Sequence, residues 1–369
     1  MKRKEGSYLT AGTAGRFVFA ALMFAAYFAT YSVFSKNPPY ADSYREVTKS
    51  IAMILSGAMS YVSFTVAELL VFVLLTAALL YLSFAIYKMC ATREVLPRLL
   101  RMLSNILAFG SAMLLLFFAL YGANYFCSPI SERMGLQVGE AYKSDLIELT
   151  ELMRDRANEY ADIVPRDMEG FCEFGNFAGM AALVPMGYET LSQEYGFLSS
   201  TYAPVKSLSA WKILASFGIS GIYVPFTGES IVVPDSPDQS IIFTMAHETA
   251  HRLSIAPEDE ANFIAFLSCR ANTDRRVAYS GYFMAYIYCV NALYAVDADS
   301  ARAVQAGVND NLAKDIAQHN ESARRYDGVL SKIGDRVNDG YLKSYGQASG
   351  TASYGLMVDL LLAAYADVL

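Results

Sequence analysis

Two histidines and a glutamate form the pattern in this sequence with the clearest chemical meaning. They occur in the run His247-Glu248-Thr249-Ala250-His251. On a helix, residues four apart share a face, so the two imidazoles can bind one metal ion, and the glutamate is turned only slightly from that face. Bound zinc lowers the pKa of a water and polarises a scissile carbonyl, while a glutamate accepts and returns the proton. The spacing therefore predicts a Zn²⁺ site for peptide-bond hydrolysis, with Glu248 as the general base.

The competing interpretation is a chance match on an ordinary helix. Such a five-residue pattern arises in roughly one chain in a hundred of this length. This chain has only three histidines, and two of them occupy ligand positions. The third, His319, lies in a polar segment and is expected to be a surface residue rather than a ligand. The pattern therefore favours a metal site.

A catalytic zinc site uses a third protein ligand and keeps a fourth position open. Three acids, Glu258, Asp259 and Glu260, follow the motif at the start of a predicted helix. We predict Glu260 as the third ligand, with Glu258 and Asp259 as alternatives. The ordinary explanation is that acids favour the positive end of a helix dipole, but the run continues with apolar residues suited to burial against the motif helix.

The elements around the motif include a predicted strand, turn and strand. β-forming residues at 219–224 and 231–233 flank the turn residues 225–229. Pro225 and Pro234 place these strands at an edge or at their ends, because proline cannot donate to an interior ladder. We expect this edge to hold an extended peptide by strand addition.

Weaker candidates for stabilising an oxyanion are Tyr341 and Tyr354.

Three long apolar runs occupy the first third of the chain, at about 17–34, 63–87 and 102–126. Each can cross a hydrocarbon core of about 30 Å. Basic residues before the first run and between the second and third predict a cytoplasmic amino terminus. We therefore predict a membrane anchor over residues 1–127 and an extracytoplasmic domain over residues 128–369. Residues 51–61 are expected to lie along the membrane surface. The apolar segments 277–296 and 352–369 are expected to be buried helices of the outer domain, with a further membrane span at 277–296 as the alternative.

Charge and cysteine content narrow the remaining function classes. The formal charge is −7, and no dense basic and aromatic tract is present, so nucleic acid is not an expected partner. The five cysteines include no Cys-x-x-Cys pair, which argues against a zinc ribbon or thioredoxin-type site. The expected partners are a peptide or protein substrate and the lipid bilayer. Whether disulfides form is left open for the four cysteines predicted to lie outside the membrane: Cys127, Cys172, Cys269 and Cys289.

The sequence resembles an uncharacterised family of bacterial membrane proteins, the domain of unknown function 3810. The resemblance rests on residues 221–229, the motif at 247–251, residues 258–263, and the segments 341–343 and 353–355. The family looks like a gluzincin-type zinc peptidase with a few amino-terminal spans and an outer domain. The resemblance implies a location in the bacterial cytoplasmic membrane. It also implies His247, His251 and Glu260 as ligands and Glu248 as base.

These observations predict a mainly α protein: three transmembrane helices, then an α+β zincin-like extracytoplasmic domain with a small sheet and an active-site helix. The first functional hypothesis is a membrane-anchored zinc metallopeptidase at the outer face of the membrane. The alternative is a non-catalytic sensor or scaffold with a structural metal site. Intramembrane proteolysis is disfavoured, because the predicted motif helix, residues 239–253, is short and flanked by charges.

Overall fold

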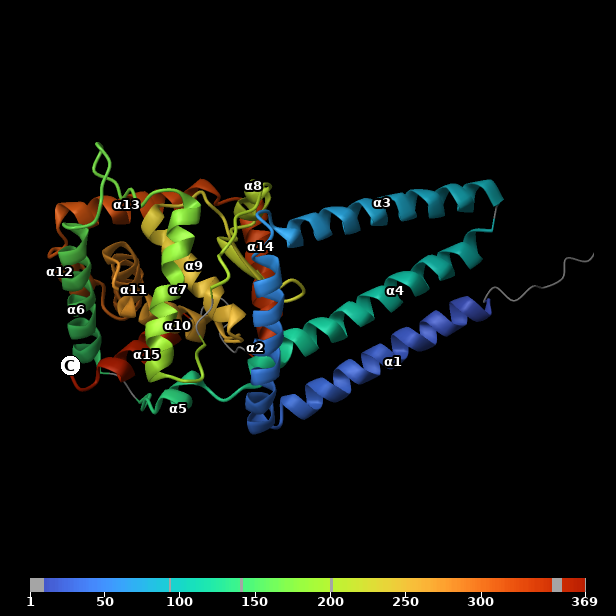
Figure 1. The fold of residues 1–369 in the computed structure, drawn as a ribbon, viewed down its shortest axis with the longest axis horizontal. Coiled ribbons are helices and arrows are strands. Elements are labelled where there is room, and N and C mark those ends of the chain that lie inside the picture. The colour runs from blue at the N-terminus through green and yellow to red at the C-terminus, as the bar shows by residue number, and fades with distance from the viewer. Residues whose placement is uncertain (1–9, 93, 140–141, 200–201, 347–353, 369) are drawn as a thin grey trace, which may run out of the picture. The chain divides into compact units, whose positions relative to one another are not determined.

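The computed structural model describes residues 10–92, 94–139, 142–199, 202–346 and 354–368. Most of these residues are helical, and Figure 1 shows the order of the elements. The chain forms two compact units. The first comprises Met1–Thr48 and Val66–Cys127, and the second comprises Lys49–Thr65 and Ser128–Leu369. The change of unit at Cys127 falls where the anchor was predicted to end, but the second unit also includes 49–65.

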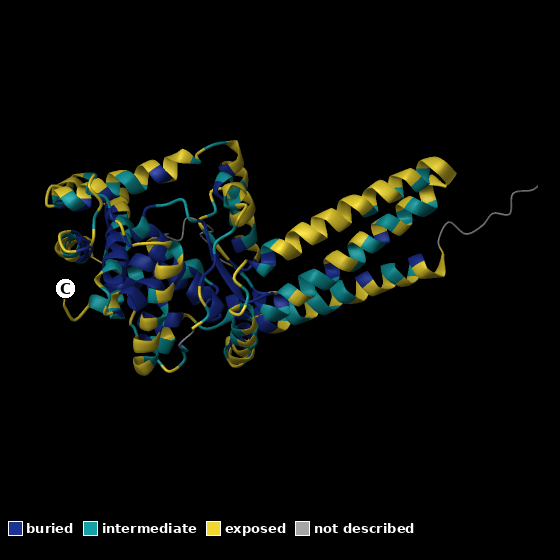
Figure 2. Ribbon diagram, turned by 45° about the horizontal axis from the view of Figure 1, so that its top comes forward, coloured by how far each residue is buried: buried dark blue, intermediate teal, exposed yellow. Residues whose placement is uncertain are grey.

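The first unit contains three helices long and apolar enough to cross a membrane: α1 (Ala11–Phe34), α3 (Val66–Thr92) and α4 (Val95–Leu120). They correspond to the three predicted runs. The third helix begins earlier than predicted because the basic connector is itself helical, and the short 3₁₀ helix η1 (Gly122–Phe126) follows α4. Phe118 of α4 packs its ring against Tyr27 and Phe34 of α1. The apolar side chains of α3 are exposed (Figure 2), as expected for a helix solvated by lipid.

Helix α2 (Pro38–Met59) differs from the prediction. A proline is tolerated in the first turn of a helix, so α2 can begin at Pro38 and Pro39. Its second half does not lie free along a membrane surface, because Ala52 and Ser56 are buried. A Cβ on Gly228 would come within 2.7 Å of the Ser56 nitrogen, so the β turn packs directly on this helix. The apolar face of this amphipathic helix therefore packs on the protein.

The second unit is a helical assembly with one small sheet. Its central helices are α9 (Asp238–Arg252) and α10 (Glu258–Ala271), which pack on each other and on α7 (Phe177–Glu194) and α11 (Arg275–Val296). As predicted, α11 is a buried helix of this unit. The remaining helices are α5 (Ile130–Met134), α6 (Lys143–Ala161), α8 (Trp211–Ser216), α12 (Ala298–Gln305), α13 (Asp310–Arg325), α14 (Val329–Ser344) and α15 (Tyr354–Tyr365).

The sheet consists of β1 (Gly221–Val224) and β2 (Glu229–Val232), as the strand, turn and strand pattern predicted. The strands are antiparallel, and Gly221 pairs with Val232. On the other side of β2, Lys206 forms a parallel bridge with Ile231. Within the described part of the chain, the outer edge of β1 is therefore the open edge of the sheet.

The cysteines of the second unit do not form a redox centre. Cys172, Cys269 and Cys289 are buried free thiols. Burial raises the pKa of the Cys269 thiol to about 12, so the thiol stays protonated near neutral pH. Small buried side chains of this kind contribute to packing rather than to chemistry.

Candidate metal centre

Helix α9 carries the two histidines toward a cavity. Its first residue, Asp238, accepts a hydrogen bond from the Phe174 nitrogen at 2.7 Å and sits at the positive end of the helix dipole. The apolar residues of α9 are buried in the core, including Ile242. One turn apart, the rings of His247 and His251 have centroids separated by 4.5 Å and stand nearly perpendicular. The four-residue spacing thus places both imidazoles on one face, as predicted.

A tight reversal after α9 returns the chain to these histidines. Ser254 has a φ of 64°, in the left-handed region, and the Ile255 nitrogen donates to the Ala250 carbonyl at 3.2 Å. The next helix, α10, begins directly afterwards at Glu258. The Glu258 carboxylate therefore lies against the motif helix.

Glu258 completes a group of three side chains that could hold a metal ion. Its Oε2 lies 3.2 Å from His247 Nε2, and its Oε1 lies 3.5 Å from His251 Nε2. The three ligand atoms lie within 4.8 Å of one another. Tetrahedral zinc with bonds of about 2.0–2.1 Å holds neighbouring ligand atoms about 3.3 Å apart. The 3.2 Å contact between His247 and Glu258 matches this separation, and the three side chains lie close enough together to share one ion.

A hydrogen bond to the backbone orients the imidazole of His251. Its Nδ1 lies 2.7 Å from the Ile255 carbonyl oxygen, which can only accept a hydrogen bond, so Nδ1 carries the proton. The lone pair of Nε2 then points toward the ligand group, the usual arrangement of a metal-binding histidine. Burial alone would lower the pKa of His251, but the adjacent Glu258 carboxylate raises this pKa to about 9. The site is thus built to hold positive charge.

The structure brings Glu258, and not Glu260, to the histidines. The Oε1 atom of Glu260 instead accepts a hydrogen bond from the Ile130 nitrogen at 2.9 Å. Two positions along a helix correspond to a rotation of about 200°, so the side chains of Glu258 and Glu260 point to opposite sides of α10. Asp259 does not join the described ligand group. The predicted ligand Glu260 therefore does not lie beside the two histidines, whereas the alternative Glu258 does.

Glu248 lies deep beside the ligand group and is only 4% exposed. Its Oε2 has no hydrogen-bond partner among the described residues. A Cβ on Gly221 would lie 2.5 Å from Glu248 Oε1, so the first residue of β1 packs directly against the carboxylate. Burial raises the pKa of Glu248, and the positive charge of the two imidazoles partly opposes this increase. A carboxylate with this environment is suited to accept a proton.

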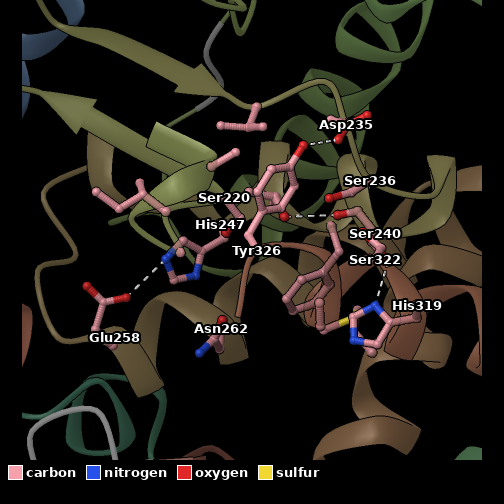
Figure 3. A pocket seen from close by; sticks show the side chains of 18 of the residues that line it. Ser220, Asp235, Ser236, Ser240, His247, Glu258, Asn262, His319, Ser322 and Tyr326 are labelled. Carbon is pink, nitrogen blue, oxygen red and sulfur yellow. Dashed lines mark hydrogen bonds and ion pairs between the residues drawn. The ribbon is translucent and has the colours of Figure 1, made fainter. Parts of the chain in front are cut away.

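A cavity of about 370 Å³ opens beside His247 and Glu258 (Figure 3). Its apolar lining includes Phe243 and Met284, and its polar lining includes several hydroxyl groups. Figure 3 shows Tyr326 reaching across the cavity toward Asp235. Side chains from α8, α9, α10, α11, α13 and α14, and from the segments flanking the sheet, contribute to the walls.

Three polar residues of this cavity were not predicted from the sequence. The Tyr326 hydroxyl donates to Asp235, which also pairs with Arg325 at 2.9 Å. Asn262 lines the cavity and accepts a hydrogen bond from the Tyr288 hydroxyl at 3.3 Å. No local pattern marks Tyr326, Asp235 or Asn262, because distant helices bring them together.

His319 is not the surface residue that was expected. It lies half-buried in the cavity wall, with Nδ1 2.9 Å from the Ser240 hydroxyl and its ring against Phe283. Burial lowers the pKa of His319. It does not join the described ligand group.

Of the two predicted oxyanion tyrosines, the described one, Tyr341, does not line the cavity. Tyr341 packs against Tyr345 with ring centroids 5.3 Å apart, whereas its helix α14 contributes Asn338 and Leu342 to the cavity. The side chain of Tyr354 lies outside the described part of the chain. Tyr326 occupies a more suitable position for a polar contact with a ligand.

Two arginines, Arg166 and the buried Arg252, hold the elements around the site. Arg166 donates to both carboxylate oxygens of Asp315, at 3.0 and 2.8 Å, and thereby fixes α13. Arg252 is only 1% exposed and donates from Nε to the Ser230 hydroxyl at 3.1 Å. The Ser230 hydroxyl in turn donates to the Glu248 carbonyl at 2.6 Å, so β2 is tied to the motif helix. Burial lowers the pKa of Arg252 to about 10, which still leaves it charged at neutral pH.

Comparison with known proteins gives one family match. Residues 44–362 match the family described as "Protein of unknown function (DUF3810)". No curated protein matches the chain. No solved structure matches it either. Since the matched region covers most of the sequence, this chain belongs to the DUF3810 family.

Proposed function

We propose that this protein is a membrane-anchored zinc metallopeptidase that acts at the outer face of a bacterial cytoplasmic membrane. His247, His251 and Glu258 would hold the zinc, and Glu248 would act as general base. The observation that carries the proposal is the convergence of His247, His251 and Glu258, whose ligand atoms lie within 4.8 Å of one another, beside a buried glutamate. The basic residues Arg98 and Arg101 near the start of α4 support a cytoplasmic position for that end of the helix.

The side chains of the site have separable roles. Bound zinc would lower the pKa of a water and polarise the scissile carbonyl. Glu248 accepts the proton of the attacking water and later delivers it to the leaving amine nitrogen. Its raised pKa brings the carboxylate closer to the range in which both transfers are efficient near neutral pH. The charged Arg252 holds the end of the motif helix through Ser230 and does not itself touch substrate.

The open edge of β1 provides a path for an extended substrate. Gly221 packs against the Glu248 carboxylate, so a peptide added along β1 would pass the general base. The cavity beside His247 would take one side chain of the substrate. Asp235 is already paired with Arg325 and Tyr326, and the rest of the lining mixes apolar side chains with hydroxyls. We therefore expect an uncharged side chain there.

Two measurements on the purified full chain in detergent test this function. The protein should bind about one zinc per chain, and X-ray absorption should show two imidazole ligands, one carboxylate and one open position. A peptide library should be cleaved by the zinc-loaded protein, should stay intact after chelation, and should be cleaved again when zinc is restored. Zinc held by four protein ligands with no cleavage would instead favour the non-catalytic sensor or scaffold.

A further inference from the structure

The start of α3 shows which part of the catalytic unit meets the membrane. Thr65 is bonded to Val66, the first residue of this membrane-spanning helix. Glu68 lies in the first turn of α3, and a carboxylate there is most stable at the interface, so Thr65 lies at the level of the lipid headgroups. The Thr65 hydroxyl donates to the Ser207 carbonyl at 2.7 Å. Ser207 therefore also lies at the membrane surface.

A buried ion pair makes this connection firm. Lys206 Nζ lies 2.9 Å from Glu229 Oε1, and both side chains are almost completely buried. The same ammonium donates to the carbonyls of Met59 and Phe64, at 2.8 and 2.9 Å. Breaking a buried pair of this kind strongly destabilises a protein. The segment that precedes α3 is thus fixed to β2.

Exposed aromatic and apolar side chains lie on two segments, the residues just before α3 and helix α8. The hydrogen bond between Thr65 and Ser207 links these segments. Tyr61 is 93% exposed and Phe64 is 55% exposed, just before α3. Ile213 of α8 is 62% exposed, and Lys212 lies over the ring of Trp211, 5.5 Å from its centroid. Aromatic side chains with polar edges concentrate at membrane interfaces, and lysine is favoured near lipid phosphates. These five residues form what we call the interfacial patch.

The interfacial patch leads directly into the wall of the cavity. Ala215 of α8 lines the cavity together with Gly218, Ile219 and Ser220. Four extended residues from Ser207 to Trp211 span at most about 14 Å, and four helical residues to Ala215 add about 6 Å. The cavity wall therefore begins within about 20 Å of the headgroup level.

From this placement we propose that the substrates are membrane-anchored polypeptides cut close to the bilayer surface. An extended chain covers about 20 Å in roughly six residues, so it reaches the cavity wall about six residues from a transmembrane helix or lipid anchor, and the scissile bond lies shortly beyond that point. The substrate class rests on the proposed peptidase function. The interfacial position of α8 does not, because it follows from Thr65, Ser207 and α3.

Trp211 allows the membrane contact to be tested without any catalytic readout, because it is the only tryptophan in the chain. The full protein is placed in vesicles whose phospholipids carry bromine near the headgroup end of the acyl chain. Fluorescence of Trp211 should be quenched several-fold more than that of the matched control, Trp211→Phe with Tyr294→Trp. Residue 294 is near the end of α11, beside α12 (Figure 1). Equal quenching in both proteins would overturn the placement of α8.

A second assay tests the substrate class. In one vesicle preparation, a randomised peptide segment is placed about six or about twenty residues from a transmembrane helix, or supplied as soluble peptide. The near segment should be cleaved at least tenfold faster than the other two. Equal rates for all three, with Glu248→Gln inactive, would overturn the substrate class and leave the peptidase function standing. Absence of cleavage in all three would contradict both, whereas quenching of Trp211 would still report the position of α8.

Discussion

The Nε2 atom of His247 and the Oε2 atom of Glu258 lie 3.2 Å apart, although the two residues belong to different helices. The reversal at Ser254 creates this contact, because it starts α10 immediately beside the end of α9. A histidine and a carboxylate at this distance form an ion pair when a proton is bound between them. The same distance is the one that two ligands of a tetrahedral zinc ion adopt.

The first prediction separates the two glutamates of α10. Glu258→Gln should weaken zinc binding by more than the roughly 10–100-fold that follows loss of an outer-shell partner. Glu260→Gln keeps an acceptor for the Ile130 nitrogen and should leave zinc affinity within a few-fold of the parent. Competition with a chelator measures both affinities. Loss of zinc in the Glu260 variant alone would restore Glu260 as the third ligand.

The second prediction concerns the contact between β1 and Glu248, the proposed general base. In Gly221→Ala the new Cβ would lie 2.5 Å from Glu248 Oε1, so either the strand or the carboxylate must move. We expect zinc to be retained, peptide cleavage to fall, and the free energy of unfolding to drop by about 1–3 kcal/mol. Gly196→Ala is the matched control, since a Cβ there meets no atom within 4 Å. Similar activity in both variants would rule out the close approach.

The third prediction uses the buried histidine of the cavity wall. Burial lowers the pKa of His319 in the folded protein, so the unfolded chain binds more protons as the pH falls. The contribution of the neutral His319 side chain to the free energy of unfolding is therefore fully present above the unfolded pKa of about 6.5. This contribution is lost as the pH falls below that value. His319→Gln should show a smaller decrease in Tm between about pH 7 and pH 5. Because both proteins keep the zinc ligands, their difference isolates His319, and parallel Tm curves would contradict the prediction.

The fourth prediction tests the ion pair that fixes α13. Asp315 is fully buried against Arg166, so Asp315→Ala leaves a partly buried arginine without its carboxylate. The free energy of unfolding in urea should fall by about 3–5 kcal/mol. Asp299→Ala removes the exposed partner of Arg302 and should cost less than about 1 kcal/mol. Equal effects of the two substitutions would show that the Arg166 pair does not hold the structure.

The sequence predicted those features that depend on local periodicity and spacing. The three long apolar runs became α1, α3 and α4, since length and hydropathy alone define a helix that can cross a bilayer. The strand pair and the motif helix also follow from residue types within a few positions. The same local signal placed His247 and His251 on one face.

The remaining features depend on tertiary structure. The choice between Glu258 and Glu260 requires the rotation of α10 about its axis, which the backbone at Ser254 helps to set. Tyr326 and His319 enter the cavity only because the buried Asp315 positions α13. Similarly, an amphipathic pattern cannot distinguish lipid from protein as the partner of its apolar face, so the burial of α2 could not be predicted.

The most direct test of the central claim compares the parent protein with Glu248→Gln at equal zinc content. Both full-length proteins are reconstituted in the same vesicles and given the same peptide library, and cleavage is followed by mass spectrometry. The parent should cleave peptides, and the variant should be slower by about 10²–10⁴-fold while it still binds one zinc. Equal cleavage by the two proteins would contradict the assignment of Glu248 as the general base of a zinc peptidase.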